Sequence, residues 1–172
     1  MLRRFRETAP AALVPAAWSL VTAVHLDVVA LRPLLIAHLV MDVVLFVFAV
    51  TGWKDMDAGV LRVWRRILVL GLVFTLGGTV GLAQTPMTEP LLGLAIGAWM
   101  VLPAVGLFYT GRSVHPAHSP MVYHIGAALS LLGGISYFAG PVIADGLTVR
   151  VAGLALVGIG QTAGIVLAVY QN

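Results

Sequence analysis

Two histidines and two aspartates lie close together in an otherwise apolar stretch near the start of the chain, at residues 24–42. They are His25, Asp27, His38 and Asp42. A charged or titratable side chain in lipid hydrocarbon is penalised by roughly 2.5–3.5 kcal/mol, so such residues usually face a partner, a cavity or a bound ion. Imidazoles and carboxylates can bind a metal or exchange protons, and imidazoles can hold a haem. This stretch is therefore where we expect a site.

The spacing within the stretch predicts a compact geometry. Arg32-Pro33 interrupts two apolar runs, which predicts a tight antiparallel hairpin, because proline is tolerated in the first turn of a helix. At ~1.5 Å per residue, His25 and His38 would both lie about 7–10 Å below this turn. Asp42 follows His38 by four residues, so we expect it on the same helix face, one turn deeper and near the bilayer middle.

One interpretation is a haem b site with His25 and His38 as axial ligands, or with one of them paired with another histidine such as His124. Asp42 would then orient His38. Two axial histidines lie on opposite sides of a flat macrocycle, which needs more room than the ~8–10 Å between packed neighbouring helices. The hairpin would have to splay to hold a haem.

A second interpretation is a non-haem metal, copper or another, bound by His25, His38 and Asp42. Two imidazoles and one carboxylate leave positions open for substrate or water. In reverse chain order, the spacing H-x12-H-x3-D is similar to the ligand pattern in the C subunit of the membrane copper monooxygenases. It is a shared geometry and not a relationship, because the order is reversed and no other stretch is similar to that family.

A third interpretation is proton or ion movement, with Asp27 and Asp42 as relay carboxylates. Desolvated carboxylates and imidazoles can exchange protons near neutral pH. Gln161 and His124 would continue the path toward the other face of the membrane. A retinal-based pump is set aside, because Lys54 is the only lysine and lies in a predicted loop.

The alternative to any functional site is helix packing, in which His38 and Asp42 bond each other across one turn. Four titratable groups within 18 residues exceed what packing needs. We expect His115 and His118 to be solvated loop residues, and His124 to be either an interfacial anchor or a ligand. The tryptophans are expected in the interfacial belt or the core, and they are Trp18, Trp53, Trp64 and Trp99.

Composition indicates an integral membrane protein. Of the 172 residues, 60% are hydrophobic and 10% charged, with a mean hydropathy of +1.00, whereas soluble domains are about 25% charged. The absence of cysteine excludes disulfides, thiolate metal sites and cysteine nucleophiles. The ten basic residues border apolar runs and form no basic face with interleaved aromatics, so we expect no nucleic-acid partner.

The apolar runs predict an all-α polytopic membrane protein with a single six-helix transmembrane domain. We expect three antiparallel hairpins in series, with spans at about 10–30, 33–50, 67–83, 91–109, 121–140 and 151–170. Eight of the ten Lys and Arg residues fall in the N-terminal tail and in the second and fourth loops, against Arg32 and Arg150 on the other face. This asymmetry predicts a multi-pass protein of the cell membrane with both termini cytoplasmic.

Glycine is abundant in the third, fifth and sixth spans, and small residues let helices approach closely in lipid. These faces exceed what six helices can pack inward, so we expect a homo-oligomer or a larger membrane complex. The leading functional hypothesis is a redox cofactor-binding protein in electron transfer, or a small subunit of a membrane oxidoreductase. The alternatives are a small proton or ion transporter or channel, and a structural membrane subunit.

Overall fold

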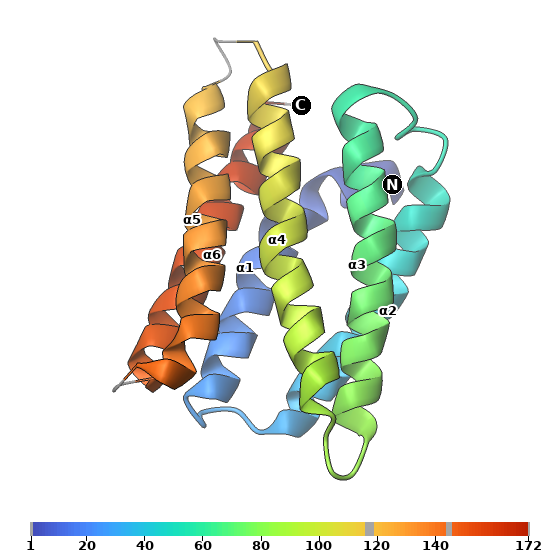
Figure 1. Ribbon diagram of the computed structural model, residues 1–172. Helices are drawn as coiled ribbons and strands as arrows, with labels where there is room; N and C mark the ends of the chain where they lie inside the picture. Colours follow the sequence, from blue (N-terminus) through green and yellow to red (C-terminus); the bar gives the residue numbers. More distant parts are fainter. Residues whose placement is uncertain (1, 116–118, 144–145, 172) are drawn as a thin grey trace.

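The chain is built from helices alone in the part that the structure describes (Figure 1). This is a computed structural model that describes residues 2–115, 119–143 and 146–171, and of residues 2–7 it describes the backbone only. The elements are α1 (Leu2–His25), α2 (Leu31–Gly52), α3 (Gly59–Ala83), α4 (Glu89–Ser113), α5 (Pro120–Ala139), the 3₁₀ turn η2 (Gly140–Val142) and α6 (Gly146–Tyr170). The predicted all-α class is confirmed.

Five of the helices, α2 to α6, are long and apolar enough to cross a membrane, by length and composition. α1 is not among them, and its sequence is less apolar, with Pro10 and Pro15 inside the helix. Apolar side chains cover the outer surfaces, for example Val43, Phe46 and Ile135, which are more than half exposed. Such a surface suits contact with lipid.

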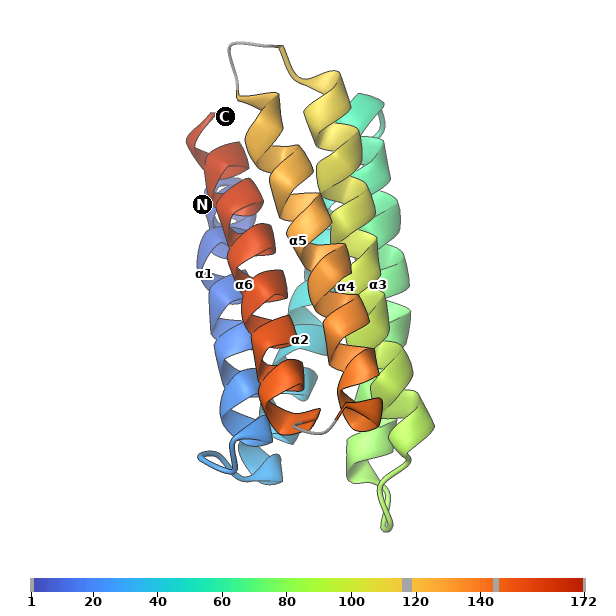
Figure 2. The same cartoon turned by 60° about the vertical axis from the view of Figure 1, so that its left-hand side comes forward.

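The helices form a row in which α2, α3, α4, α5, α6 and α1 are successive neighbours, and the two views show α1 lying beside α6 (Figures 1 and 2). α1 touches α2 only lightly. The tight first hairpin expected from the sequence is therefore not seen. The reason is the apolar face of α1, where Trp18 packs with Met100 of α4 and with Leu154 and Val157 of α6. The predicted arrangement as three antiparallel hairpins and the six predicted spans are not confirmed.

α5, with its η2 extension, meets α6 backbone to backbone through three pairs of glycines. A Cβ atom added at any of these glycines would lie 2.4–2.8 Å from the carbonyl oxygen of its partner, so no side chain fits between the two helices. Within each helix the glycines recur every seven residues. The pairs are Gly126 with Gly160, Gly133 with Gly153, and Gly140 with Gly146.

The other glycines of α6 also face this chain's own helices. A Cβ at Gly158 would lie 3.2 Å from Trp18 Cβ, and one at Gly164 would lie 2.5 Å from a methyl carbon of Leu107. Gly77 and Gly93, on α3 and α4, have open space around them. The glycines of α5 and α6 thus have partners within one chain, which removes much of the argument for an oligomer. The oligomer itself stays a prediction.

Candidate functional site

Five polar side chains are buried among the residues that the structure describes. They are Asp42, Thr75, Thr110, Ser130 and Gln161. Buried polar groups need hydrogen-bond partners, because a buried group without one costs roughly 1–3 kcal/mol. Four of the five, all except Thr110, belong to one hydrogen-bonded layer across the bundle, and the partners in that layer define the candidate site.

Gln161 of α6 is the centre of one half of this layer. Its side-chain oxygen accepts a hydrogen bond from Trp18 Nε1 at 3.0 Å. Its amide nitrogen donates to the backbone oxygen of Trp99 at 2.8 Å and to Ser130 Oγ at 2.7 Å. Ser130 in turn donates to the backbone oxygen of Met100 at 2.7 Å. A single buried amide therefore connects α1, α4, α5 and α6.

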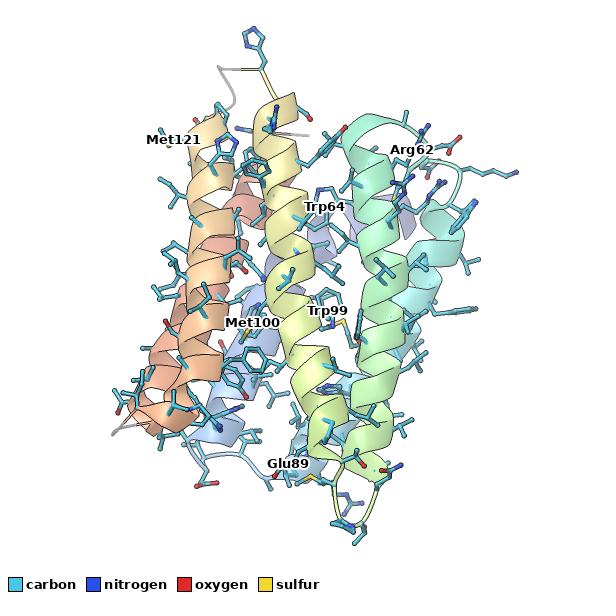
Figure 3. All side chains as sticks on the ribbon, in the orientation of Figure 1. Arg62, Trp64, Glu89, Trp99, Met100 and Met121 are labelled. Atoms are coloured by element: carbon cyan, nitrogen blue, oxygen red, sulfur yellow. The ribbon has the colours of Figure 1, made fainter. Side chains whose placement is uncertain are left out.

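The other half of the layer runs from α4 to α2. The Trp99 indole lies between α4 and α3 (Figure 3) and donates from Nε1 to Thr75 Oγ1 at 2.8 Å. Thr75 donates to the backbone oxygen of Gly71 at 2.8 Å. One turn along α3, Thr79 Oγ1 donates to Asp42 Oδ2 at 2.7 Å. Asp42 is therefore held from α3, at the end of the polar layer.

Asp42 has one carboxylate oxygen without a partner. The side chain is buried, with 8% of the residue exposed, yet Oδ1 has no hydrogen bond. Among the residues that the structure describes, no other buried side-chain nitrogen or oxygen lacks a hydrogen-bond partner. A carboxyl group between apolar helices is costly to bury unless it is paired, so Asp42 is a candidate functional residue.

His38 lies one helical turn before Asp42 on α2 and also faces α3. Its Nδ1 lies 3.0 Å from the backbone oxygen of Leu34 and must donate to it, because a carbonyl only accepts. In the neutral ring this leaves a lone pair on Nε2, which can accept a proton or bind a metal. A Cβ at Gly78 would lie 3.3 Å from Nε2, so a larger residue there would crowd the ring.

His25 is engaged elsewhere. Its Nδ1 donates to the backbone oxygen of Val21 at 2.8 Å, and its Nε2 accepts a hydrogen bond from the Tyr137 hydroxyl of α5 at 2.8 Å. The two rings meet edge to face at 5.5 Å between centroids, and the Arg150 guanidinium lies 5.6 Å from the Tyr137 ring centroid. Between helices, His25 thus contacts α5, whereas His38 faces Gly78 of α3.

The remaining predicted residues do not join His38 and Asp42. His124 packs against α4, 5.5 Å from Phe108 between ring centroids, near the start of α5 and far along that helix from Tyr137. Asp27 is exposed in the α1–α2 connection, where its φ of 56° is left-handed. His115 is exposed, and His118 lies outside the described residues.

No group of three or more histidine, cysteine, aspartate or glutamate residues that could hold a metal ion occurs among the described residues. The set of His25, His38 and Asp42 is thus not assembled around one point in this structure. It remains a prediction about the protein with a cofactor bound.

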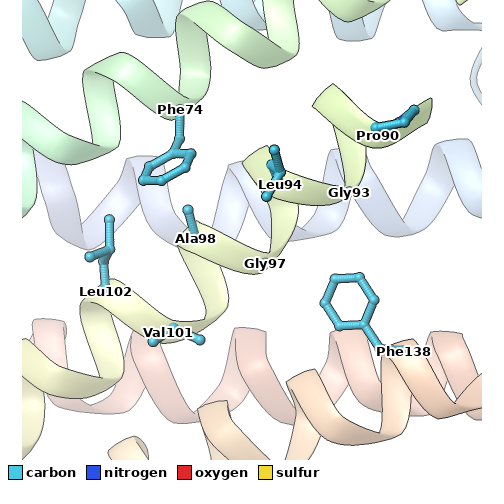
Figure 4. A pocket seen from close by; sticks show the side chains of 9 residues that line it. All are labelled: Phe74, Pro90, Gly93, Leu94, Gly97, Ala98, Val101, Leu102 and Phe138. Atoms are coloured by element: carbon cyan, nitrogen blue, oxygen red, sulfur yellow. The ribbon is translucent and has the colours of Figure 1, made fainter. Parts of the chain in front are cut away.

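Two hollows on the surface lie away from these groups. One, of about 530 Å³, lies across α3, α4 and α5 and is almost entirely apolar, with Phe74, Leu94 and Phe138 on its walls (Figure 4). The other, of about 580 Å³, lies between α1 and α6 and includes Trp18 and Thr22. Neither is lined by a histidine or a carboxylate.

Reasoning from sequence did not identify Thr75, Thr79, Ser130 or Tyr137 as members of the polar layer or partners of the histidines. The available signal was two threonines four residues apart on an apolar helix, which lie on one face. Comparisons with protein-family models, curated proteins and solved structures found no match to this chain. The function is therefore argued from the site alone.

Proposed function

We propose that this protein binds and transfers protons within a membrane, at a buried site formed by Asp42 and His38 on α2. The observation that carries the proposal is the Asp42 oxygen Oδ1, which is buried among apolar helices without a hydrogen-bond partner. A carboxylate held there at an energetic cost is typical of a proton or ion pathway. A proton is the simplest ligand that the Asp42 carboxyl group can take, and a neutral carboxyl lowers the cost of the buried Oδ1.

The two groups suit successive steps of a relay. The Nε2 lone pair of His38 can accept a proton, and Asp42 lies one turn deeper on the same side of α2. Asp27 is exposed in the connection before α2, where it can collect protons from water. The path that we propose runs from Asp27 through His38 to Asp42.

The topology of this proposal follows from the ends of the bundle. Both termini lie at one end of the bundle together with the α2–α3 and α4–α5 connections (Figure 1). The basic residues in or beside these two connections are Lys54, Arg62, Arg65, Arg66 and Arg112. We propose that all six helices cross the cell membrane, alternating in direction as three hairpins in chain order, with both termini in the cytoplasm. In space, the first helix packs on the last.

A second candidate function is binding of a redox cofactor, haem b or copper or another metal, in electron transfer or as a small oxidoreductase subunit. The supporting observation is that backbone carbonyls hold Nδ1 of both His25 and His38, as is usual for histidines that ligate through Nε2. To bind the cofactor, His25 Nε2 would have to give up its hydrogen bond with the Tyr137 hydroxyl. Purified protein with a Soret band or bound metal would favour this candidate, and Asp42→Asn would leave haem bound but strip a non-haem metal.

Proton uptake into lipid vesicles tests the first candidate. Vesicles with the purified protein and an internal pH-sensitive dye receive an imposed potassium diffusion potential. Asp42→Asn is expected to reduce uptake to the level of protein-free vesicles, because the amide cannot bind the proton. Asp57→Asn is the matched control, since Asp57 is an exposed carboxylate paired with Arg65 outside the spans. Uptake by Asp42→Asn at the parent's rate would refute the proposal.

A further inference from the structure

The Thr79 hydroxyl lies between two acceptors. Its oxygen is 2.7 Å from Asp42 Oδ2 and 3.0 Å from the backbone oxygen of Thr75. A hydroxyl has one hydrogen and can donate to only one of them at a time.

We infer that Thr79 is a positioning residue that follows the proton on Asp42, an inference that rests on the proposed function. When Asp42 is ionised, the Thr79 hydroxyl donates to Oδ2, and this charge-assisted bond is the stronger choice. When Oδ2 carries a proton, its O–H donates to Thr79 Oγ1, and the Thr79 hydroxyl turns to the Thr75 oxygen. No covalent bond of Thr79 changes, and both states keep a hydrogen bond at Oδ2.

The switch costs little because the Thr75 oxygen is already satisfied. Within α3 it accepts the backbone N–H of Thr79, so it loses no necessary partner when the hydroxyl turns away. The groups of α3 that lie near the site, Thr75, Gly78 and Thr79, do not titrate. On α1, which touches α2 lightly, His25 is the one titratable group among the described side chains, and it bonds Tyr137. His38 is thus the titratable neighbour one turn away.

The rest of the polar layer cannot carry the proton further. The Thr75 hydroxyl donates to the Gly71 oxygen and accepts from Trp99 Nε1, and an indole N–H is a donor only. A proton on Asp42 therefore does not pass through this layer, and its onward path lies along the α2–α3 face. The layer between Thr75 and Gln161 fixes the helices around the site.

Infrared difference spectra between low and high pH test this inference in the full-length protein in lipid. The C=O stretch of the protonated carboxyl is assigned by its loss in Asp42→Asn. In Thr79→Val we expect this band to move to higher wavenumber, because the carboxyl loses its partner. Proton uptake should fall about tenfold, since one charge-assisted hydrogen bond is lost. Thr79→Ser, which keeps the hydroxyl, should leave both the band position and the rate of proton uptake at the parent's values.

Thr22→Val is the matched control, because Thr22 makes the same bond to a backbone oxygen one turn earlier, at 2.8 Å to Trp18, with no carboxylate. If Asp42→Asn abolishes the band and uptake while Thr79→Val matches the parent, the Thr79 inference is wrong and the proposed function stands. If Asp42→Asn changes neither the band nor the uptake, the Thr79 inference and the proposed function both fail. Should Thr79→Val not fold, Thr79→Ala gives the same test, and a band at the parent's position overturns the inference.

Discussion

The α5–α6 pair and the α2–α3 pair solve helix packing in opposite ways. Between α5 and α6 the backbones touch at three glycine pairs, and no side chain enters the contact at those points. Between α2 and α3, His38 faces Gly78, and Asp42 bonds Thr79. The first contact leaves no volume for chemistry, whereas the second contains a buried acceptor without a partner.

The difference indicates where the molecule can change state. Direct backbone contact gives many small attractive interactions that any displacement would lose together. α2 stands at the end of the row of helices, with α3 as its one extensive neighbour, and much of its remaining surface is exposed and apolar. A helix with fewer contacts can shift at lower cost. A group that gains and loses a proton is better placed on α2 than on α5 or α6.

The largest effect is expected from a substitution that forces α5 and α6 apart. A methyl group in Gly133→Ala would lie 2.4 Å from the Gly153 carbonyl oxygen, so α5 and α6 must separate. We expect a loss of about 3 kcal/mol or more in the free energy of unfolding in detergent. Gly93→Ala is the control, because nothing lies within 4 Å of the new atom. Equal stability of the two variants would show that the glycine contact is dispensable.

Asp42→Leu is expected to stabilise the protein, whereas Gly133→Ala destabilises it. Asp42→Leu removes the oxygen without a partner, and Thr79 keeps the Thr75 oxygen as an acceptor. The free energy of unfolding should rise by about 1–3 kcal/mol while proton uptake is lost. Val43→Leu, on the exposed side of α2, should change neither the free energy of unfolding nor the proton uptake. Destabilisation by Asp42→Leu would mean that Asp42 serves packing, and the contrast between the two pairs would disappear.

Tyr137→Phe has the smallest expected effect. It removes the hydroxyl that donates to His25 Nε2 and leaves the ring in place. The free energy of unfolding should fall by about 1 kcal/mol with proton uptake unchanged. Tyr170→Phe, at a residue that is 85% exposed, is the control. If Tyr137→Phe abolished uptake, the pathway would include α1 and α5, and the site could not be confined to α2 and α3.

Local features of this molecule were predictable from sequence. The apolar runs located the helices, although the ends of the helices differ from the predicted spans. α3 begins at Gly59 and includes Arg62 and Arg65 before its apolar part, whereas α1 ends at His25 and not at Ala30. Backbone hydrogen bonds continue a helix past the point where its side chains stop being apolar. The four-residue spacing likewise predicted His38 and Asp42 on one face of α2.

Long-range pairing was not predictable. Thr79 is 37 residues from Asp42, and Tyr137 is 112 residues from His25. Apolar composition alone does not select which helix faces meet, so α1 was expected on α2 and packs on α6. The glycine pairs did leave a signal, because their seven-residue spacing is visible in the sequence. Their abundance was instead interpreted as a surface for another chain.

The glycine spacing also bears on the winding and the alignment of the last hairpin. A repeat of seven residues is 3.5 per turn, slightly less than the 3.6 of a straight helix, and such a repeat favours a left-handed coil of the two helices. Sliding one helix along the other by one to six residues would set side chains against backbone. A slide of seven would pair glycines again, but it would require a connection seven residues longer or shorter. The C-terminal hairpin can therefore assemble in a single register.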